Sequence, residues 1–95
     1  MSKQQYRSEM GIISDILRVT MDCGRQGAII SSIARRANLS HYTAIGKCQK
    51  LVDFRLMEYV SDKRNRTFII TEKGMQIFQE MQKFIELVQA VKIRC

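Results

Sequence analysis

The stretch that decides the fold is residues 40–70, SHYTAIGKCQKLVDFRLMEYVSDKRNRTFII, because the spacing of its apolar residues changes once. In its first half these residues recur at helical spacing, which predicts an amphipathic helix. From Leu56 onward they alternate, which predicts a half-buried strand. A second β-prone run, Thr67 to Ile70, follows Met57 to Ser61 after the basic run Lys63-Arg64-Asn65-Arg66. A helix followed by a basic-tipped hairpin favours a small domain that binds DNA.

The helix of this stretch is expected to begin after Ser40, its N-cap, and to end near Phe54. One face forms an apolar stripe: Ala44, Ile45, Cys48, Leu51 and Val52. The other face is small, polar or basic: Tyr42, Thr43, Gly46, Lys47 and Lys50. A glycine within a helix costs about 1 kcal/mol relative to alanine. Gly46 therefore indicates either close approach of the backbone to a partner or tolerance of a weak position.

A shorter helix is expected before it, capped by Ser31 or Ser32 and running through Ala37. Its apolar positions are Ile33, Ala34 and Ala37. Its arginines, Arg35 and Arg36, point outward, either toward a DNA backbone or simply into solvent.

The two helices are separated by Asn38-Leu39-Ser40, a connection of turn length. This arrangement predicts a helix-turn-helix unit over residues 33–51, whose second helix enters the major groove of DNA. The alternative is a helical pair that only shows a polar face to water.

The chain before this unit predicts one more helix. Ser8 is a suitable N-cap and Gly24 a stop signal. The apolar positions between them are Met10, Ile13, Ile16, Leu17 and Met21. The run Ala28-Ile29-Ile30 is too short to decide between a single-bridge strand and the lead-in to the next helix.

A last helix is expected from Thr71, its N-cap, to the end of the chain. Its a/d seam consists of Ile77, Met81, Phe84, Val88, Val91 and Cys95, with Ile85 beside it. The seam can pack on the core of its own domain or against a second copy. Because residues 84–91 project beyond so small a core, a two-helix dimer seam is expected there. Cys95 admits either a disulfide between subunits or a free thiol.

In order, these elements predict an α+β, mainly α domain with the series α-α-α-β-β-α, a winged helix-turn-helix with an optional short strand near Ala28. Residues 1–74 are expected to form the DNA-binding domain. Residues 75–95 are expected to form a coiled-coil dimerisation helix within the same compact unit. Ninety-five residues suffice for one such core but not for two.

Composition narrows the class of partner. Sixteen Lys and Arg against nine Asp and Glu give a net charge of +7, which points to a polyanion and first to nucleic acid. The polar start of the chain lacks the apolar core of a signal peptide, and no run is long enough for a membrane span. A cytoplasmic, nucleoid-associated protein is therefore expected.

Catalytic motifs are not recognisable. The chain has no glycine-rich phosphate loop, paired-carboxylate constellation or nucleophile motif. The single histidine, His41, lies beside the N-cap Ser40 and is interpreted as a surface residue rather than a catalyst. The three cysteines lie far apart without a Cys-x-x-Cys pair, and Cys23 and Cys48 are interpreted as small core residues. The chain is expected not to be an enzyme and to use no metal, cofactor or small-molecule effector.

The residues expected to contact double-stranded DNA lie on the helix-turn-helix and on the hairpin tip: Arg35, Arg36, Ser40, Tyr42, Thr43, Gly46, Lys47, Lys50, Lys63, Arg64, Asn65 and Arg66. Ser40 donates to a phosphate on this interpretation, while Tyr42, Thr43 and Gly46 approach base edges or sugars. Lys47 and Lys50 reach phosphates or guanine acceptors. The hairpin arginines contact the backbone or a narrow minor groove, unless the tip is only a solvated turn.

Four short segments together resemble a known family: IARRANLS at residues 33–40, KLV at residues 50–52, LME at residues 56–58 and ITEKG at residues 70–74. They are similar to archaeal winged helix-turn-helix regulators, in particular the small basic chromatin proteins that dimerise through a C-terminal coiled coil. The resemblance spans Ser8 to about Val91. Its most specific part is the run from Thr71 to Gly74, followed by a long helix.

The resemblance implies a MarR-like winged-helix fold, a homodimer, sequence-specific or architectural binding of double-stranded DNA, and no cofactor. It places Ser40, Tyr42, Thr43, Lys47 and Lys50 on the recognition helix and Arg64 to Arg66 on the wing. Arg55 departs from the pattern, because such proteins usually have glycine where the recognition helix ends. Since a left-handed backbone is strained in arginine, the helix end is expected to differ or its register to be loose.

The leading hypothesis is a homodimeric DNA-binding transcriptional regulator. One alternative is a chromatin-architectural protein with weak sequence preference. The other is a protein-interaction module, in which the helix-turn-helix is a scaffold and the last helix docks a larger partner.

Overall fold

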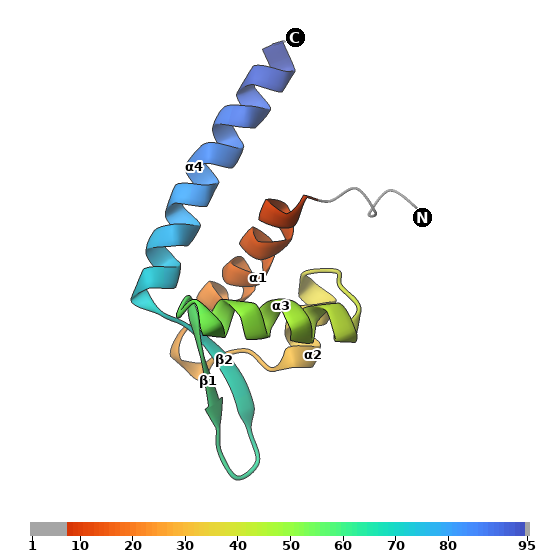
Figure 1. Cartoon of the computed structure of the whole chain (residues 1–95), viewed down its shortest axis with the longest axis vertical. Coiled ribbons are helices and arrows are strands. Elements are labelled where there is room, and N and C mark those ends of the chain that lie inside the picture. Colours follow the sequence, from red (N-terminus) through yellow and green to blue (C-terminus); the bar gives the residue numbers. More distant parts are fainter. Residues whose placement is uncertain (1–7, 95) are drawn as a thin grey trace.

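The helices and the hairpin follow one another in the predicted order in the computed structural model, which describes residues 8–94 (Figure 1). The elements are α1 (Glu9–Cys23), the 3-10 turn η2 (Gly24–Gln26), α2 (Ile30–Arg36), α3 (His41–Asp53), β1 (Met57–Ser61), β2 (Arg66–Ile70) and α4 (Glu72–Arg94). The predicted α+β, mainly α fold is confirmed.

The core lies where α1, α2 and α3 meet the base of the hairpin. Its buried apolar side chains come from every element except η2 and α4: Ile16, Leu17, Val19, Ala28, Ile33, Ala37, Cys48, Leu51, Met57, Phe68 and Ile70. The buried hydroxyl of Thr20 donates to the carbonyl oxygens of Ile16 and Leu17 at 3.2 and 2.9 Å, so it carries no unsatisfied polar atom into the core. Burial raises the pKa of the Cys48 thiol to about 12, so this group stays protonated at neutral pH.

Two of the predicted N-caps are confirmed within the first three helices. Ser8 Oγ accepts a hydrogen bond from the Gly11 backbone N–H at 2.9 Å, and Ser40 Oγ accepts one from the Thr43 N–H at 3.1 Å. The prediction of Ser31 or Ser32 as a cap is wrong, because α2 already begins at Ile30 and its N-cap, Ile29, makes no side-chain hydrogen bond.

The early start of α2 has a tertiary cause. Ala28 and Phe68 exchange two backbone hydrogen bonds, of 2.9 and 2.8 Å, in an isolated antiparallel bridge. This bridge holds the chain extended up to Ile29, and the helix follows at once. Both interpretations of residues 28–30 are therefore correct in part, since Ala28 forms a single bridge and Ile30 opens the helix.

The hairpin pairs β1 with β2 from Met57 opposite Ile70 to Ser61 opposite Arg66. Arg66 thus belongs to the second strand, one residue earlier than predicted. The expectation of a half-buried β1 is wrong beyond its first residue, because only Met57 is buried. The reason is that the hairpin extends past the core, as Figure 1 shows. The rings of Tyr59 and Phe68 lie 5.0 Å apart and stabilise the pairing midway.

The end of α3 adopts a left-handed conformation in spite of the missing glycine. Arg55 has a φ of 65°, and its N–H donates to the Val52 carbonyl oxygen at 2.9 Å. The Leu56 N–H donates to the Leu51 carbonyl oxygen at 2.9 Å. The expectation of a different helix end is therefore wrong, since arginine accepts a strain of about 1–2 kcal/mol at this place.

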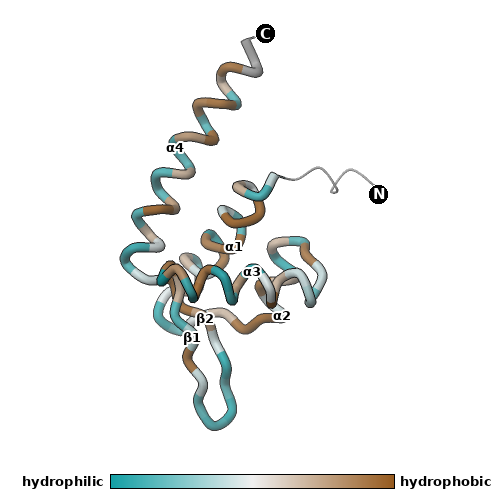
Figure 2. Tube along the Cα trace, viewed as in Figure 1, coloured by the Kyte–Doolittle hydropathy of each residue, from teal (hydrophilic) through white to brown (hydrophobic). Residues whose placement is uncertain are grey.

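The first half of α4 packs on α1. Ser14 Oγ, which is buried, donates to Gln82 Oε1 at 3.1 Å, and the Arg18 guanidinium lies 5.7 Å from the centre of the Phe78 ring. Ile77, Phe78 and Met81 are half-buried against the core. Beyond this contact, α4 extends away from the other elements with apolar residues still recurring along it (Figure 2). The predicted seam residue Cys95 lies outside the described residues.

Candidate nucleic-acid interface

The outward face of α3 is fixed by the side chains that the helix buries. Ala44, Cys48 and Leu51 point into the core. At 100° per residue, the positions farthest from them form one line along the helix: Tyr42, Gly46, Gln49 and Asp53. All four are exposed, and 87% of the surface of Tyr42 is accessible. Among the predicted contact residues, Tyr42 and Gly46 therefore lie where a groove of DNA would meet the helix.

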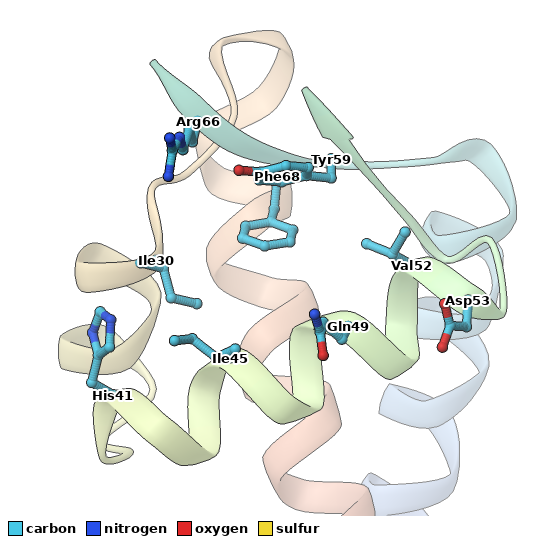
Figure 3. A pocket seen from close by; sticks show the side chains of 9 residues that line it. All are labelled: Ile30, His41, Ile45, Gln49, Val52, Asp53, Tyr59, Arg66 and Phe68. Atoms are coloured by element: carbon cyan, nitrogen blue, oxygen red, sulfur yellow. The ribbon is translucent and has the colours of Figure 1, made fainter. Parts of the chain in front are cut away.

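A groove of about 690 Å³ separates α3 from the hairpin (Figure 3). Its walls are mostly apolar. The residues that line it are Ile30, His41, Ile45, Gln49, Val52, Asp53, Tyr59, Arg66 and Phe68. In Figure 3, His41 and Arg66 stand at one end of the groove and Asp53 at the other. The groove shows that α3 and the hairpin present neighbouring surfaces on one side of the molecule.

The hairpin tip is an ordered turn. The Asp62 N–H donates to the Asn65 carbonyl oxygen at 2.7 Å, and the Asp62 carboxylate accepts from the Lys63 N–H at 2.7 Å. Lys63, Arg64, Asn65 and Arg66 are all exposed. The tip carries three positive charges, on Lys63, Arg64 and Arg66, and the one negative charge of Asp62 offsets only one of them.

Lys47 lies on the flank of α3 that faces α1. Its Nζ is 2.7 Å from both carboxylate oxygens of Glu9. Lys50 is exposed and lies nearer the outward line. Of the two predicted lysines, Lys50 is thus the one already presented to solvent, whereas Lys47 is engaged by α1.

The two arginines of α2 also differ. Both are exposed, but Arg36 Nη2 pairs with Asp22 Oδ2 at 2.9 Å, which links α2 to the end of α1. An exposed pair of this kind contributes about 0–1 kcal/mol, so it orients Arg36 without removing its charge from the surface. Arg35, the preceding residue of α2, is exposed as well.

Ser40 and Thr43 close the first turn of α3. The Ser40 hydroxyl donates to Thr43 Oγ1 at 2.9 Å while accepting from the Thr43 N–H. To donate to a phosphate, the Ser40 hydroxyl would have to give up its hydrogen bond to Thr43 Oγ1. The exposed first turn of α3 itself offers backbone N–H groups at the positive end of the helix dipole.

A sequence model described as a winged helix-turn-helix matches residues 6–89. The chain belongs to this family. In its terms, α2 and α3 form the helix-turn-helix and the β1–β2 hairpin is the wing. The winged helix-turn-helix family that the sequence resembles is thus confirmed, and archaeal proteins share its fold.

Solved structures with the same winged fold come from archaea and bacteria. Sso10a-2, a DNA-binding protein from Sulfolobus solfataricus, is 21% identical with a TM-score of 0.81, over 93% of this chain and 88% of that one. AF1382 from Archaeoglobus fulgidus is 17% identical with a TM-score of 0.70, over 92% and 97%. BpsR from Bordetella bronchiseptica is 17% identical with a TM-score of 0.75, over 95% and 64%. A search of curated protein sequences finds no match.

Sequence reasoning missed Gln49 and underestimated the exposure of Ile45. Gln49 lies on the outward line of α3 between Gly46 and Asp53, and the neighbouring side chain of Ile45 is partly exposed. The signal was available, because the spacing 42, 46, 49, 53 follows from the buried positions alone. Gln49 carries no charge and therefore did not stand out.

Neither a metal site nor a membrane span is found in the described part of this winged helix. Residues 8–94 hold no group of His, Cys, Asp and Glu side chains that could bind a metal ion. None of the helices there is long and apolar enough to cross a membrane.

Replacement of Gly46 tests whether the fold itself requires a glycine at this position of α3. A Cβ atom built on Gly46 meets no atom within 4 Å. We expect Gly46→Ala to raise the free energy of unfolding by about 0.5–1 kcal/mol, because alanine loses less backbone entropy than glycine in a helix. Urea unfolding followed by circular dichroism measures this change. A loss of stability instead would show that the isolated fold itself requires the glycine.

Proposed function

We propose that this winged helix-turn-helix protein is a homodimeric transcriptional regulator that binds double-stranded DNA. In this proposal α3 enters the major groove and the wing contacts the backbone or an adjacent minor groove. The observation that carries the proposal is that Gln49 and Asp53 of the outward line and Arg66 of the basic wing line one groove. The net charge of +7 supports a polyanionic partner for this surface.

The predicted contact residues take different parts in this proposal. Tyr42, Gly46 and Thr43 face bases or sugars, and Lys50 reaches a phosphate. Lys63, Arg64, Asn65 and Arg66 form a backbone clamp on the wing. Lys47 contacts a phosphate by exchanging Glu9 for it, and Arg35 and Arg36 add charge at the edge. Ser40 supports the helix end that faces the DNA.

The division of the chain is part of the same proposal. Residues 1–74 bind DNA, and residues 75–95 join two copies. The support is the exposure of large apolar side chains on the distal part of α4: Phe84, Leu87, Val88 and Val91. Such a stripe is unfavourable in water and fits a two-helix seam. Ile77, Met81 and Ile85 are half-buried already and border it.

A second candidate function is a chromatin-architectural role. It is favoured by the charge distribution, because Arg35, Arg36, Lys50 and the wing can contact phosphates whereas the outward line carries no cation. Both candidates include nucleoid association and the absence of enzymatic activity as parts of the proposal. BpsR is regulated in its DNA binding by 6-hydroxynicotinic acid; that this chain acts without an effector stays a prediction.

A mobility-shift titration over a salt series tests the proposal. A regulator shows strong salt dependence together with a sequence that is bound far more tightly than random duplex. An architectural protein shows the salt dependence alone. Absence of any shift at low salt would refute DNA binding and leave the protein-interaction module as the remaining hypothesis.

The wing supplies the first mutational prediction on binding. We expect Arg64→Ala with Arg66→Ala to weaken binding to every duplex alike, because backbone contacts carry no sequence information. The magnitude of the negative slope of log K against log salt should decrease by about 2, roughly 0.9 for each phosphate contact that is lost.

Fluorescence anisotropy at several salt concentrations measures this slope. The control is Lys83→Ala, which removes one positive charge from the exposed surface of α4, an element separate from the wing. A loss confined to one sequence, or an equal loss with Lys83→Ala, would contradict the role given to the wing.

A further inference from the structure

Gln49 occupies the middle of the surface that α3 presents. It lies on the outward line, one turn after Gly46 and one turn before Asp53, and it borders the groove toward the wing. Figure 3 shows it on α3 between Ile45 and Val52. Within residues 8–94, no protein group hydrogen-bonds to its side-chain amide. Its donor and acceptor are both free for an external partner.

Gly46 brings this amide closer to any partner that lies along α3. Gly46 has no side chain, and no atom lies within 4 Å of its Cβ position. The surface of α3 is therefore recessed at Gly46, one turn before Gln49. A rigid surface can therefore approach the helix backbone here. The side chain of Gln49 then stands as the first polar group in reach.

An apolar shelf runs beside Gln49. It is formed by partly exposed side chains that line the groove, Ile45, Val52 and Tyr59. In the major groove the apolar feature of a base pair is the C5-methyl group of thymine. Adenine offers N6–H₂ and N7, which match the oxygen and the NH₂ of a glutamine amide.

Guanine has no comparable partner on the outward line. Its O6 and N7 acceptors are usually read by arginine or lysine, and Tyr42, Gly46, Gln49 and Asp53 include neither. The positive charges flank the line, with Lys47 held toward α1 by Glu9. The flanking charges suit phosphates, while the centre of the line suits an A·T pair.

We propose that Gln49 is a specificity-determining residue that reads adenine in an A·T pair, with the apolar shelf of Ile45, Val52 and Tyr59 contacting a thymine methyl group. This inference rests on the proposed function, since it assumes that α3 lies in the major groove. It adds the base class that the protein selects.

Selection of bound duplexes from a random library, with the full chain, tests the inference. The wild type should enrich an A·T pair at one position of each half-site, by about ten-fold or more. Gln49→Ala should lose the preference at that position only. Gln49→Glu should move it toward C·G, because a carboxylate accepts from cytosine N4. Gln79→Ala, an exposed glutamine on α4, should keep the wild-type profile.

The outcomes separate this inference from the proposed function. Salt-dependent binding without any base preference overturns the role of Gln49 and leaves an architectural DNA-binding protein. A G·C pair at the selected position, or an unchanged profile for Gln49→Ala, also overturns it. If the random library is not bound even at low salt, the proposed function fails and the inference fails with it.

Discussion

Gly74→Ala is expected to lower the free energy of unfolding by about 2–3 kcal/mol, a large share of the stability of a domain of this size. A Cβ atom on Gly74 would collide with the carbonyl oxygen of Leu56 and would come within 2.8 Å of Ile70 Cγ1. That carbonyl cannot move freely, because it accepts the Thr71 N–H at 3.1 Å. The first turn of α4 would have to shift away from the base of the wing.

Thermal unfolding followed by circular dichroism measures the effect. A loss of this size should lower the Tm by roughly 10–20 °C in a domain of this length. Gly46→Ala is the matched control, since it makes the same chemical change in open space on α3 and should raise the Tm. Equal Tm values for the two variants would contradict the close approach of α4 to Leu56.

Phe84→Glu with Val88→Glu is expected to convert a dimer into a monomer. The two side chains lie one turn apart on the exposed apolar stripe of α4, and they are 51% and 40% exposed in the single chain. Burying two carboxylates without partners in a helix seam costs more than the seam can supply. Light scattering coupled to size exclusion should give the dimer mass for the wild type and half that mass for the variant.

The control for this variant adds the same charge to the opposite side of the helix. Gln79 and Gln89 are exposed and lie on the far side of the helix from the stripe, so Gln79→Glu with Gln89→Glu should keep the dimer mass. Dissociation of both variants would point to a general charge effect, and an unchanged mass of the Phe84/Val88 variant would refute the seam. Folding of each variant is checked by its helical signal at low temperature.

Local signals in the sequence predict most of this fold. Ser8, Ser40 and Thr71 cap three of the helices, and Thr71 Oγ1 accepts the Gly74 N–H at 3.0 Å as expected of an N-cap. The change from helical to alternating spacing at Leu56 locates the wing. These features depend on neighbours only a few positions away, and local chemistry is what a sequence shows directly.

The errors arise where distant residues decide the local structure. α2 starts early because Ala28 pairs with Phe68, and β1 is exposed because the wing leaves the core. Arg55 takes a conformation that its own side chain disfavours, held by a hydroxyl from Thr71. No spacing rule contains these partners.

The candidate interface follows the same division. The position of α3 and the charge of the wing could be predicted, because both follow from periodicity and composition. The pairing of Lys47 with Glu9 and of Arg36 with Asp22 could not, since the partners lie on α1. A cation in one of these pairs must leave its carboxylate before it can contact a phosphate. Lys47 is in such a pair, whereas Lys50 is not.

The contacts of Thr71 have a mechanical consequence. Its hydroxyl donates to the Arg55 carbonyl oxygen at 2.7 Å and accepts the Gly74 N–H at 3.0 Å. Lys73 Nζ donates to the Phe54 carbonyl oxygen at 3.3 Å. One joint thus fastens the end of α3 to the start of α4. In a dimer assembled through α4, this joint would link the orientation of each α3 to the pairing of the two α4 helices, so the pairing would set the spacing between the two α3 helices.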